Sequence, residues 1–137
     1  MTALAGIAEG FRTSQRYVIT REVYDRFLAT FGDTNPLHMD DDVARRAGFP
    51  ERVMHGMILG GFVSHFVGVH FPGANSLLHA VSTQFKSPCH LGDEIRIDAT
   101  VTQVVEAVRV IAMDLVLTNV SRGGRLAAKC KVQVGVP

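Results

Sequence analysis

Two strings of sequence decide the fold: Phe-Gly-Asp-Thr-Asn-Pro-Leu-His at residues 31–38, and His-Gly-Met-Ile-Leu-Gly-Gly-Phe-Val-Ser at residues 55–64. The second string belongs to a run, from Val53 to Val69, that is apolar on every side and contains four glycines. Each glycine weakens a helix by about 1 kcal/mol relative to alanine, and close contact of the backbone with a sheet or a ligand would offset that cost. We therefore predict a buried central helix from about Met54 to Val69.

The first string carries a carboxylate and an imidazole, Asp33 and His38, on either side of an Asn35-Pro36 turn. Residues 21–31 before it have helical periodicity, and Gly32 permits the chain to leave that helix. Because the residue before a proline is excluded from the helical region, the helix cannot continue. We expect Asp33 and His38 on a bent, irregular segment, where they could hold one water molecule between them.

The rest of the chain indicates strands. β-branched runs with partial alternation, separated by turn signals, follow the central helix, and one short β-prone run precedes the first helix. The expected elements are a strand at Arg16–Thr20, a helix over 21–31 capped by Thr20, a short helix over 39–48, and strands at Leu77–Phe85, Glu94–Val105, Val108–Asn119 and Leu126–Val134. Four strands in a row are consistent with an antiparallel meander. The sequence thus predicts one α+β domain over residues 1–137, with a helix on a curled antiparallel sheet of about five strands. Residues 1–14 are expected to be loosely ordered.

The composition argues against several classes of function. The formal net charge is +1, so no basic field favours nucleic acid. The two cysteines, Cys89 and Cys130, are too few for a disulfide framework or a zinc site and are expected as thiols in a reducing compartment. The N-terminus has no basic n-region, and the apolar run falls short of the about 18 to 20 uninterrupted apolar residues of a membrane helix. We expect a cytoplasmic protein with no metal, no nucleic-acid partner and no membrane span.

Taken together, these strings resemble the MaoC-like (R)-specific enoyl-CoA hydratases. The resemblance rests on the Gly-Asp-Thr-Asn-Pro-Leu-His string, on Val-Met-His-Gly-Met at residues 53–57, on Phe-Lys-Ser-Pro at 85–88 and on Gly-Asp-Glu at 92–94. It extends over residues from about 15 to 134. It implies the hot-dog fold, in which a long helix is wrapped by an antiparallel sheet. It also implies a homodimer joined sheet to sheet and an acyl tunnel beside the central helix.

The reaction implied by this resemblance is hydration of a trans-2-enoyl thioester to the (R)-3-hydroxyacyl thioester, or the reverse dehydration. On this interpretation Asp33 is the base that acts on a water attacking C3, while His38 helps to hold the water and delivers a proton to C2. One water between two groups on the same side predicts syn addition. The N–H of Gly56, at the positive start of the central helix, is the expected donor to the thioester oxygen. No metal or organic cofactor is required.

Four more residues are candidates near the substrate. Asn35 is expected to orient the loop, and His55 to have a structural role near the helix start. Some relatives carry a serine in the central helix near the catalytic pair. Alignment through His-Gly-Met places Gly61 there, and Ser64 falls three residues later. A glycine at this position could enlarge the pocket, so the acyl chain length stays open.

A basic rim would suit either the phosphates of CoA or the surface of an acyl-carrier protein. The candidates for this rim are Arg45, Arg46, Arg52 and Lys86. Ordinary solvated charge is an equal alternative for each of them. The acidic residues 40–42 are interpreted as helix capping and solvated charge.

Two rival functions share the fold. A hot-dog acyl-CoA thioesterase would place an acidic residue on or beside the central helix, but no Asp or Glu occurs between Glu51 and Asp93. A non-catalytic acyl-thioester-binding subunit would not need the Asp33 and His38 pair, which is intact. Hydratase or dehydratase activity is therefore the preferred hypothesis.

Overall fold

The structure, a computed structural model, describes residues 3–137. The α-helices are α1 (Arg21–Phe31), α2 (Pro36–Met39), α3 (Asp41–Arg46) and α4 (Met57–His65), and the strands are β1 (Arg12–Val18), β2 (Leu77–Phe85), β3 (Glu94–Val105), β4 (Val110–Asn119) and β5 (Arg125–Gly135). A π-helical turn, η2 (Phe66–His70), continues α4, and short 3-10 turns are η1 (Ala3–Gly6), η3 (Glu106–Val108) and η4 (Val120–Arg122). No helix within residues 3–137 is long and apolar enough to cross a membrane.

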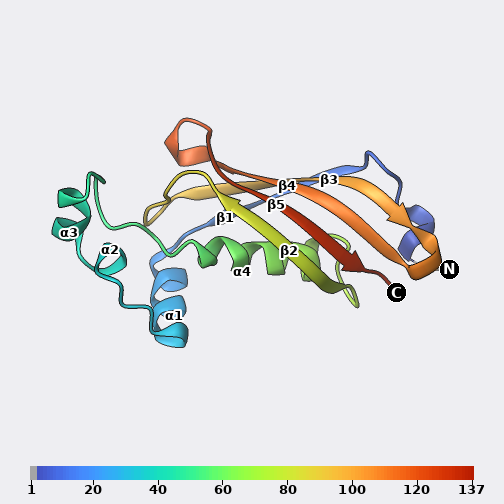
Figure 1. Cartoon of the computed structure of the whole chain (residues 1–137), viewed down its shortest axis with the longest axis horizontal. Coiled ribbons are helices and arrows are strands. Elements are labelled where there is room, and N and C mark those ends of the chain that lie inside the picture. Colours follow the sequence, from blue (N-terminus) through green and yellow to red (C-terminus); the bar gives the residue numbers. More distant parts are fainter. Residues whose placement is uncertain (1–2) are drawn as a thin grey trace.

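One sheet contains all five strands, in the order β1-β3-β4-β5-β2, and each neighbouring pair is antiparallel. Helix α4 lies along one face of this sheet, whereas α1, α2 and α3 gather at one end of the molecule (Figure 1). The C-terminus lies at the opposite end. The predicted α+β fold, with a long helix wrapped by an antiparallel sheet of about five strands, is confirmed, and the structure shows that this sheet does not close.

The core lies between α4 and the sheet, because alternate residues of the three central strands point toward the helix. The buried strand residues are Ile95, Ile97, Ala99 and Val101 on β3, Ile111, Met113, Leu115 and Leu117 on β4, and Ala128, Cys130, Val132 and Val134 on β5. Helix α4 adds Ile58, Leu59, Phe62 and Val63. Burial of each large aliphatic side chain contributes about 1.5–3 kcal/mol, so this layer holds helix and sheet together.

The four glycines in and beside α4 do not all contact the sheet. Only Gly56, just before the helix, comes close to the sheet: a Cβ atom there would lie 3.2 Å from the Phe85 ring on β2. A Cβ on Gly60 would meet only the Met57 side chain of the same helix, and one on Gly61 or Gly68 would meet no atom within 4 Å. Close contact with the sheet therefore explains one of the four glycines, and contact with a ligand stays a prediction for the others.

The strands follow the prediction, but the way they pair does not. Strand β2 lies at one edge of the sheet, beside β5, and the connection over residues 86–93 crosses the sheet to β3, which pairs with β1 at the opposite edge. The meander is thus limited to β3, β4 and β5. Strand β1 begins at Arg12 rather than Arg16 and is exposed along most of its length, so it lacks the alternating apolar pattern by which strands are recognised.

The N-terminal segment is more ordered than expected. Leu4, in η1, is 4% exposed and packs into the core, and β1 includes residues that we had placed in the loose segment. Residues 1 and 2 lie outside the described part of the chain. That the chain forms a single domain stays a prediction.

The segment after α1 also differs from the prediction. Asp33 lies in a loop, but His38 lies on the four-residue helix α2 rather than on irregular chain. Proline is well suited to the first position of a helix, and Asn35 caps α2 by accepting from the N–H of Leu37 at 3.1 Å. The proline that ends one helix therefore begins the next.

The three aspartates at the start of α3, residues 40–42, have different roles, although the prediction treated them alike. Asp40 caps α3 by accepting from the N–H groups of Asp42 and Val43, and this confirms the capping role. Asp41 instead accepts from both the backbone N–H and the Nε of Arg52 at 3.0 Å. These hydrogen bonds from Arg52 lower the pKa of Asp41 from 3.8 to about 2. Asp41 thereby ties α3 to the segment that leads into α4.

This link predicts an acid-sensitive contribution to stability. A carboxyl whose pKa is lowered on folding stabilises the folded state above its unfolded pKa, here 3.8, and loses that effect as the pH falls toward 2. Thermal unfolding followed by circular dichroism should show a smaller loss of stability between those pH values in Asp41→Asn than in the wild type. Asp42→Asn, which removes a surface pair with Arg45, is the control. An unchanged pH dependence in Asp41→Asn would contradict this account.

Candidate active site

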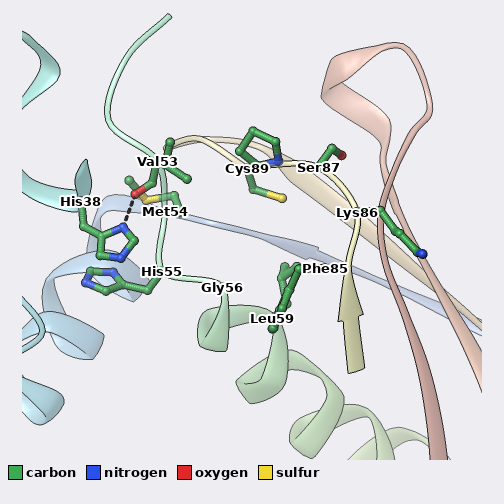
Figure 2. A pocket seen from close by; sticks show the side chains of 11 residues that line it. His38, Val53, Met54, His55, Gly56, Leu59, Phe85, Lys86, Ser87 and Cys89 are labelled. Carbon is green, nitrogen blue, oxygen red and sulfur yellow. Dashed lines mark hydrogen bonds between the residues drawn. The ribbon is translucent and has the colours of Figure 1, made fainter. Parts of the chain in front are cut away.

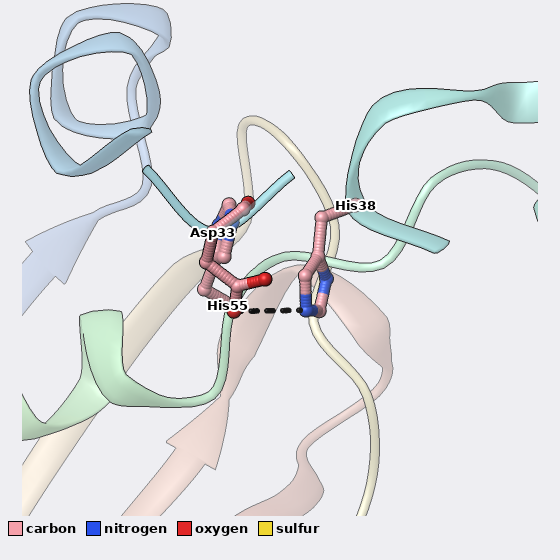
Figure 3. Close-up of side chains that lie close together, drawn as sticks. All are labelled: Asp33, His38 and His55. Carbon is pink, nitrogen blue, oxygen red and sulfur yellow. Dashed lines mark hydrogen bonds and ion pairs between the residues drawn. The ribbon is translucent and has the colours of Figure 1, made fainter. Parts of the chain in front are cut away.

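Asp33 and His38 face each other at the end of the molecule where α1 and α2 meet the start of α4 (Figure 3). The Oδ2 atom of Asp33 lies 3.8 Å from Nε2 of His38. This separation is too long for a direct hydrogen bond, but it suits two groups that share one small polar molecule, because a hydrogen bond to each would have an ordinary length of about 2.8 Å. The sequence-based pairing of these two side chains is reproduced by the geometry.

His38 is held firmly. Its Nδ1 atom donates to the backbone carbonyl of Val53 at 2.7 Å, since a carbonyl can only accept. The hydroxyl of Tyr24 donates to the backbone carbonyl of His38 at 2.5 Å. The imidazole therefore carries a proton on Nδ1, and Nε2 is the atom presented to Asp33.

Asp33 is held less firmly. Its Oδ1 atom accepts from the N–H of Asn35 at 3.2 Å, which closes the turn and leaves Oδ2 free to face His38. Asn35 thus orients the loop, as predicted, both through this N–H and through its cap on α2. The Asp33 side chain is 51% exposed, whereas that of His38 is 16% exposed.

His55 packs beneath the pair. It is 3% exposed, and its Nε2 donates to the backbone carbonyl of Asp33 at 2.8 Å. Its ring lies 4.1 Å from that of His38 and 4.8 Å from that of Phe27, measured between centroids. Its Nδ1 is buried and has no hydrogen-bond partner among residues 3–137. These contacts match the structural role that we expected, since His55 fixes the backbone at Asp33 and the plane of His38.

The same three residues are the one His, Asp, Glu or Cys cluster within residues 3–137 with a metal-like arrangement, their ligand atoms lying within 4.8 Å of one another. Two of the ring nitrogens already donate to the carbonyls of Val53 and Asp33. The Nδ1 of His55 is buried, so only Asp33 Oδ2 and His38 Nε2 face the open site. Two ligand atoms fall short of the three protein ligands usual for a catalytic zinc. The arrangement fits acid–base chemistry better.

Two cavities meet at Gly56 and His55. The first, which we call the His38 cavity, has a volume of about 310 Å³ and runs from His38 past Leu59 to Phe85, Lys86 and Cys89 (Figure 2). The second, the Asp33 cavity, has a volume of about 500 Å³ and is lined by Asp33, His55, Gly56 and the apolar residues Phe27, Phe31 and Met57, with Gly61 beside them. The Asp33–His38 pair therefore lies between two spaces that a long, narrow ligand could occupy together.

Comparison of the sequence with known proteins shows the family of this chain. A family model described as "MaoC like domain" matches residues 3–121. The chain belongs to the MaoC-like family. It is 30% identical over 131 residues to an (R)-specific enoyl-CoA hydratase of Rhodospirillum rubrum, covering 96% of this chain and 89% of that protein. It is 44% identical over 78 residues to a mitochondrial 3-hydroxyacyl-[acyl-carrier-protein] dehydratase of Arabidopsis thaliana, covering 57% of this chain and 46% of that protein.

Solved structures agree with this assignment. The (R)-hydratase from A. caviae involved in PHA biosynthesis superposes with a TM-score of 0.88 and 27% identity, over 96% of this chain and 98% of that one. The resemblance predicted from the Gly-Asp-Thr-Asn-Pro-Leu-His string, and the hot-dog fold that it implied, are therefore confirmed.

The remaining candidate residues of this MaoC-like chain differ in whether they line the cavities beside Asp33 and His38. Gly56 and Gly61 line the Asp33 cavity, and Gly56 also lines the His38 cavity. Ser64 is exposed on α4 and lines neither cavity. Where some relatives carry a serine, this chain thus has Gly61, which lines the Asp33 cavity, and Ser64 does not take the place of that serine.

The four basic residues predicted to bind the carrier also differ in where they lie. Lys86 lines the His38 cavity, although Figure 2 shows its amino group directed away from the two imidazoles. Arg52 pairs with Asp41, and Arg45 pairs with Asp42 and donates to the carbonyl of Pro50. Arg46 is exposed. Of these four candidates, only Lys86 lines the His38 cavity or the Asp33 cavity.

Some residues of the site were missed or misplaced by sequence reasoning. Phe31 was given no role at the site, but it is 70% exposed and borders the Asp33 cavity, because it is the last residue of α1 and lies beyond the core. The carbonyl of Val53 was missed since a backbone group leaves no side-chain signal. Cys89 also lines the His38 cavity; burial, followed by the charge of Asp93, raises its pKa to about 11, so the thiol is not poised as a nucleophile.

Proposed function

We propose that this protein catalyses the (R)-specific hydration of trans-2-enoyl thioesters to (R)-3-hydroxyacyl thioesters, or the reverse dehydration. The observation that carries this proposal is the Asp33 Oδ2 to His38 Nε2 separation of 3.8 Å at the junction of two cavities. Relatives named as (R)-specific enoyl-CoA hydratase and 3-hydroxyacyl dehydratase support the same reaction class.

A single water molecule between Asp33 and His38 would supply the nucleophile. Asp33 is the base: its Oδ2 takes a proton as the water oxygen forms a bond to C3 of the enoyl group. The π electrons of the C2–C3 bond move toward the thioester carbonyl, which becomes enolate-like. His38 then delivers a proton to C2 from Nε2. Positioned proton transfers of this kind are worth about 10²–10⁴-fold in rate.

The surroundings of His38 suit a proton donor. The carbonyl of Val53 keeps one proton on Nδ1, so the proton that passes to C2 must be a second one, carried on Nε2, the ring atom that faces Asp33. Because both groups lie on the same side of the bound enoyl chain, the hydroxyl group and the proton would add to the same face. This gives the syn addition expected from the sequence.

The thioester oxygen needs a donor as negative charge develops on it. The N–H of Gly56 precedes the nine-residue helix α4, where the helix dipole is positive, and it has no acceptor among the residues that the structure describes. Gly56 also lines both cavities, so a thioester lying across their junction would bring its oxygen toward this N–H. We assign Gly56 as the oxyanion donor.

The two cavities suggest how the substrate lies. The Asp33 cavity is the larger and is bordered by Phe27, Phe31 and Met57, so it suits the acyl chain. The His38 cavity leads to Lys86, which suits the thioester arm and a phosphate of its carrier. Both CoA and acyl-carrier protein stay open as carriers, and relatives are named for each.

Neither rival function gains support from the structure. The residues of α4, Met57 to His65, include no carboxylate that could serve a thioesterase. A purely binding subunit would not explain why Val53 and Tyr24 fix the orientation of His38. A cytoplasmic location is also part of our proposal, supported by the two buried free cysteines.

The proposal is tested by adding crotonyl-CoA, with longer enoyl-CoAs alongside, and following the loss of enoyl absorbance. We expect an (R)-3-hydroxy product by chiral analysis, and rates lower by about 10²–10⁴-fold in both Asp33→Asn and His38→Ala. Ser64→Ala, which changes a residue outside both cavities, is the control and should retain activity. Full turnover in Asp33→Asn would contradict the mechanism, and release of free thiol without hydration would favour a thioesterase.

A second test concerns Gly56. Its φ of −58° is helical, so alanine suits the backbone, but the new Cβ would lie 3.2 Å from the Phe85 ring and beside the proposed oxyanion donor. Gly56→Ala keeps the N–H, but its Cβ should block the thioester oxygen from reaching it. The variant should therefore unfold at nearly the wild-type temperature and yet lose up to about 10²–10³-fold in turnover, the effect of losing one oxyanion donor. Gly68→Ala, where the Cβ meets no atom within 4 Å, is the matched control. Equal activity in both variants would remove Gly56 from the mechanism.

We also propose a homodimer joined along the edge strand β2. This unpaired edge exposes three apolar side chains, Leu77, Val81 and Phe85, and Phe85 extends into the His38 cavity. Sedimentation should give twice the chain mass of 14.9 kDa for the wild type and a weaker dimer for Val81→Lys. The control Val108→Lys alters an exposed valine in the turn η3, away from β2. Dimers of equal strength in both variants would place the interface elsewhere.

A further inference from the structure

The segment Arg52–Met54 runs between α3 and α4, and its backbone is bonded on two opposite sides. On one side, the N–H of Val53 donates to the carbonyl of Leu37 at 2.9 Å, and the Val53 carbonyl accepts from His38 at 2.7 Å. On the other side, the N–H of Met54 donates to the carbonyl of Cys89 at 2.8 Å. This is the alternating pattern of an extended strand.

A second histidine holds this segment from the side opposite His38. The Nδ1 atom of His90 donates to the carbonyl of Arg52 at 2.9 Å. His90 and His38 therefore donate to two successive carbonyls, those of Arg52 and Val53. His90 is 3% exposed and lies outside both cavities, so the mechanism described above gives it no role.

His90 is itself anchored to the sheet. Its N–H donates to Oδ2 of Asp93, a carboxylate that is 3% exposed. The same carboxylate accepts from Nδ2 of Asn119 at 2.7 Å and from Nε of Arg122 at 3.1 Å. A buried carboxylate with several donors is a rigid support, because each donor fixes its position further. The ring of His90 is thus fixed relative to the ends of β3 and β4.

The peptide plane between Arg52 and Val53 connects His90 to the active site. A peptide unit is rigid, so the Arg52 carbonyl and the Val53 N–H move together. His90 and Leu37 hold this plane at its two ends. The next plane carries the Val53 carbonyl, which keeps the proton of His38 on Nδ1. Without the donor on His90, the first plane would be held at one end only, and the direction of the Val53 carbonyl would depend on the bond from the Met54 N–H to Cys89 alone.

We propose that His90 is a positioning residue: through the carbonyl of Arg52 it orients the carbonyl of Val53, which fixes the tautomer of His38 and aims Nε2 at Asp33. This inference rests on the hydratase function proposed above. His90 lines neither substrate cavity, and the buried hydrogen bonds of Asp93 would serve to hold its ring in place.

The test uses two variants of similar shape. Asparagine can place an amide donor where Nδ1 of His90 lies, whereas leucine fills similar space without a donor. The ¹⁵N chemical shifts of the His38 ring, measured where the imidazole is neutral, report its tautomer without any substrate. We expect the Nδ1-protonated form in the wild type and in His90→Asn, and a mixture of tautomers in His90→Leu.

Kinetics provide the second readout. Groups that orient a catalytic or ligating imidazole commonly contribute about 10–100-fold, so the kcat of His90→Leu should fall by that factor while KM changes less than about threefold. His90→Asn should restore most of the rate. Ser76→Ala, which removes side-chain hydrogen bonds to the carbonyls of Val67 and Gly73 far from the site, controls for a general loss of stability.

A wild-type tautomer and wild-type kcat in folded His90→Leu would overturn the proposal. If that variant does not fold, the wild type alone decides: an unprotonated Nδ1 on His90, or no scalar coupling across its hydrogen bond to Arg52, would equally overturn it. If the wild type hydrates no enoyl thioester, the proposed function fails. The tautomer of His38 would still report whether His90 positions it.

Discussion

The packing of α4 against the sheet is the interaction on which the rest of the structure depends. Ile58, Leu59, Phe62 and Val63 are buried against the central strands, and this contact fixes where the helix begins. The start of α4 in turn places Gly56 and His55 at the junction of the two cavities. The position of the proposed oxyanion donor is therefore a consequence of core packing.

Buried polar groups are concentrated at the same end of the molecule. The buried polar or charged side chains of residues 3–137 are His55, His90, Asp93 and Asn119. Burying such groups costs free energy unless they are hydrogen-bonded, and most of their hydrogen bonds lead to the segments that carry Asp33, Arg52 and His90. The polar network thus holds irregular chain in one conformation, where regular secondary structure offers no support.

Much of this could be predicted from the sequence. The apolar run located the central helix to within about three residues at its start, and the β-branched runs located β2 and β3 to the residue. The Asp33–His38 pair followed from one string and the resemblance that it carries. Strand pairing could not be predicted in the same way, since β2 and β3 are neighbours in sequence but lie at different places in the sheet. The roles of the Val53 and Arg52 carbonyls could not be predicted either, because every residue has a backbone carbonyl and only the fold determines which one accepts a hydrogen bond from a histidine.

The two members of the proposed catalytic pair are held in different ways, and this difference bears on how water could be kept from the reaction. His38 is fixed by a carbonyl and is mostly buried, whereas Asp33 is half-exposed and held by its own turn. Phe31 and Met57, which border the cavity around Asp33, are 70% and 62% exposed. An acyl chain lying in that cavity would cover both apolar side chains and remove bulk water from around the carboxylate. Electrostatic interactions strengthen as water is excluded, so the pair would gain its full effect only when a substrate with an apolar tail is in place.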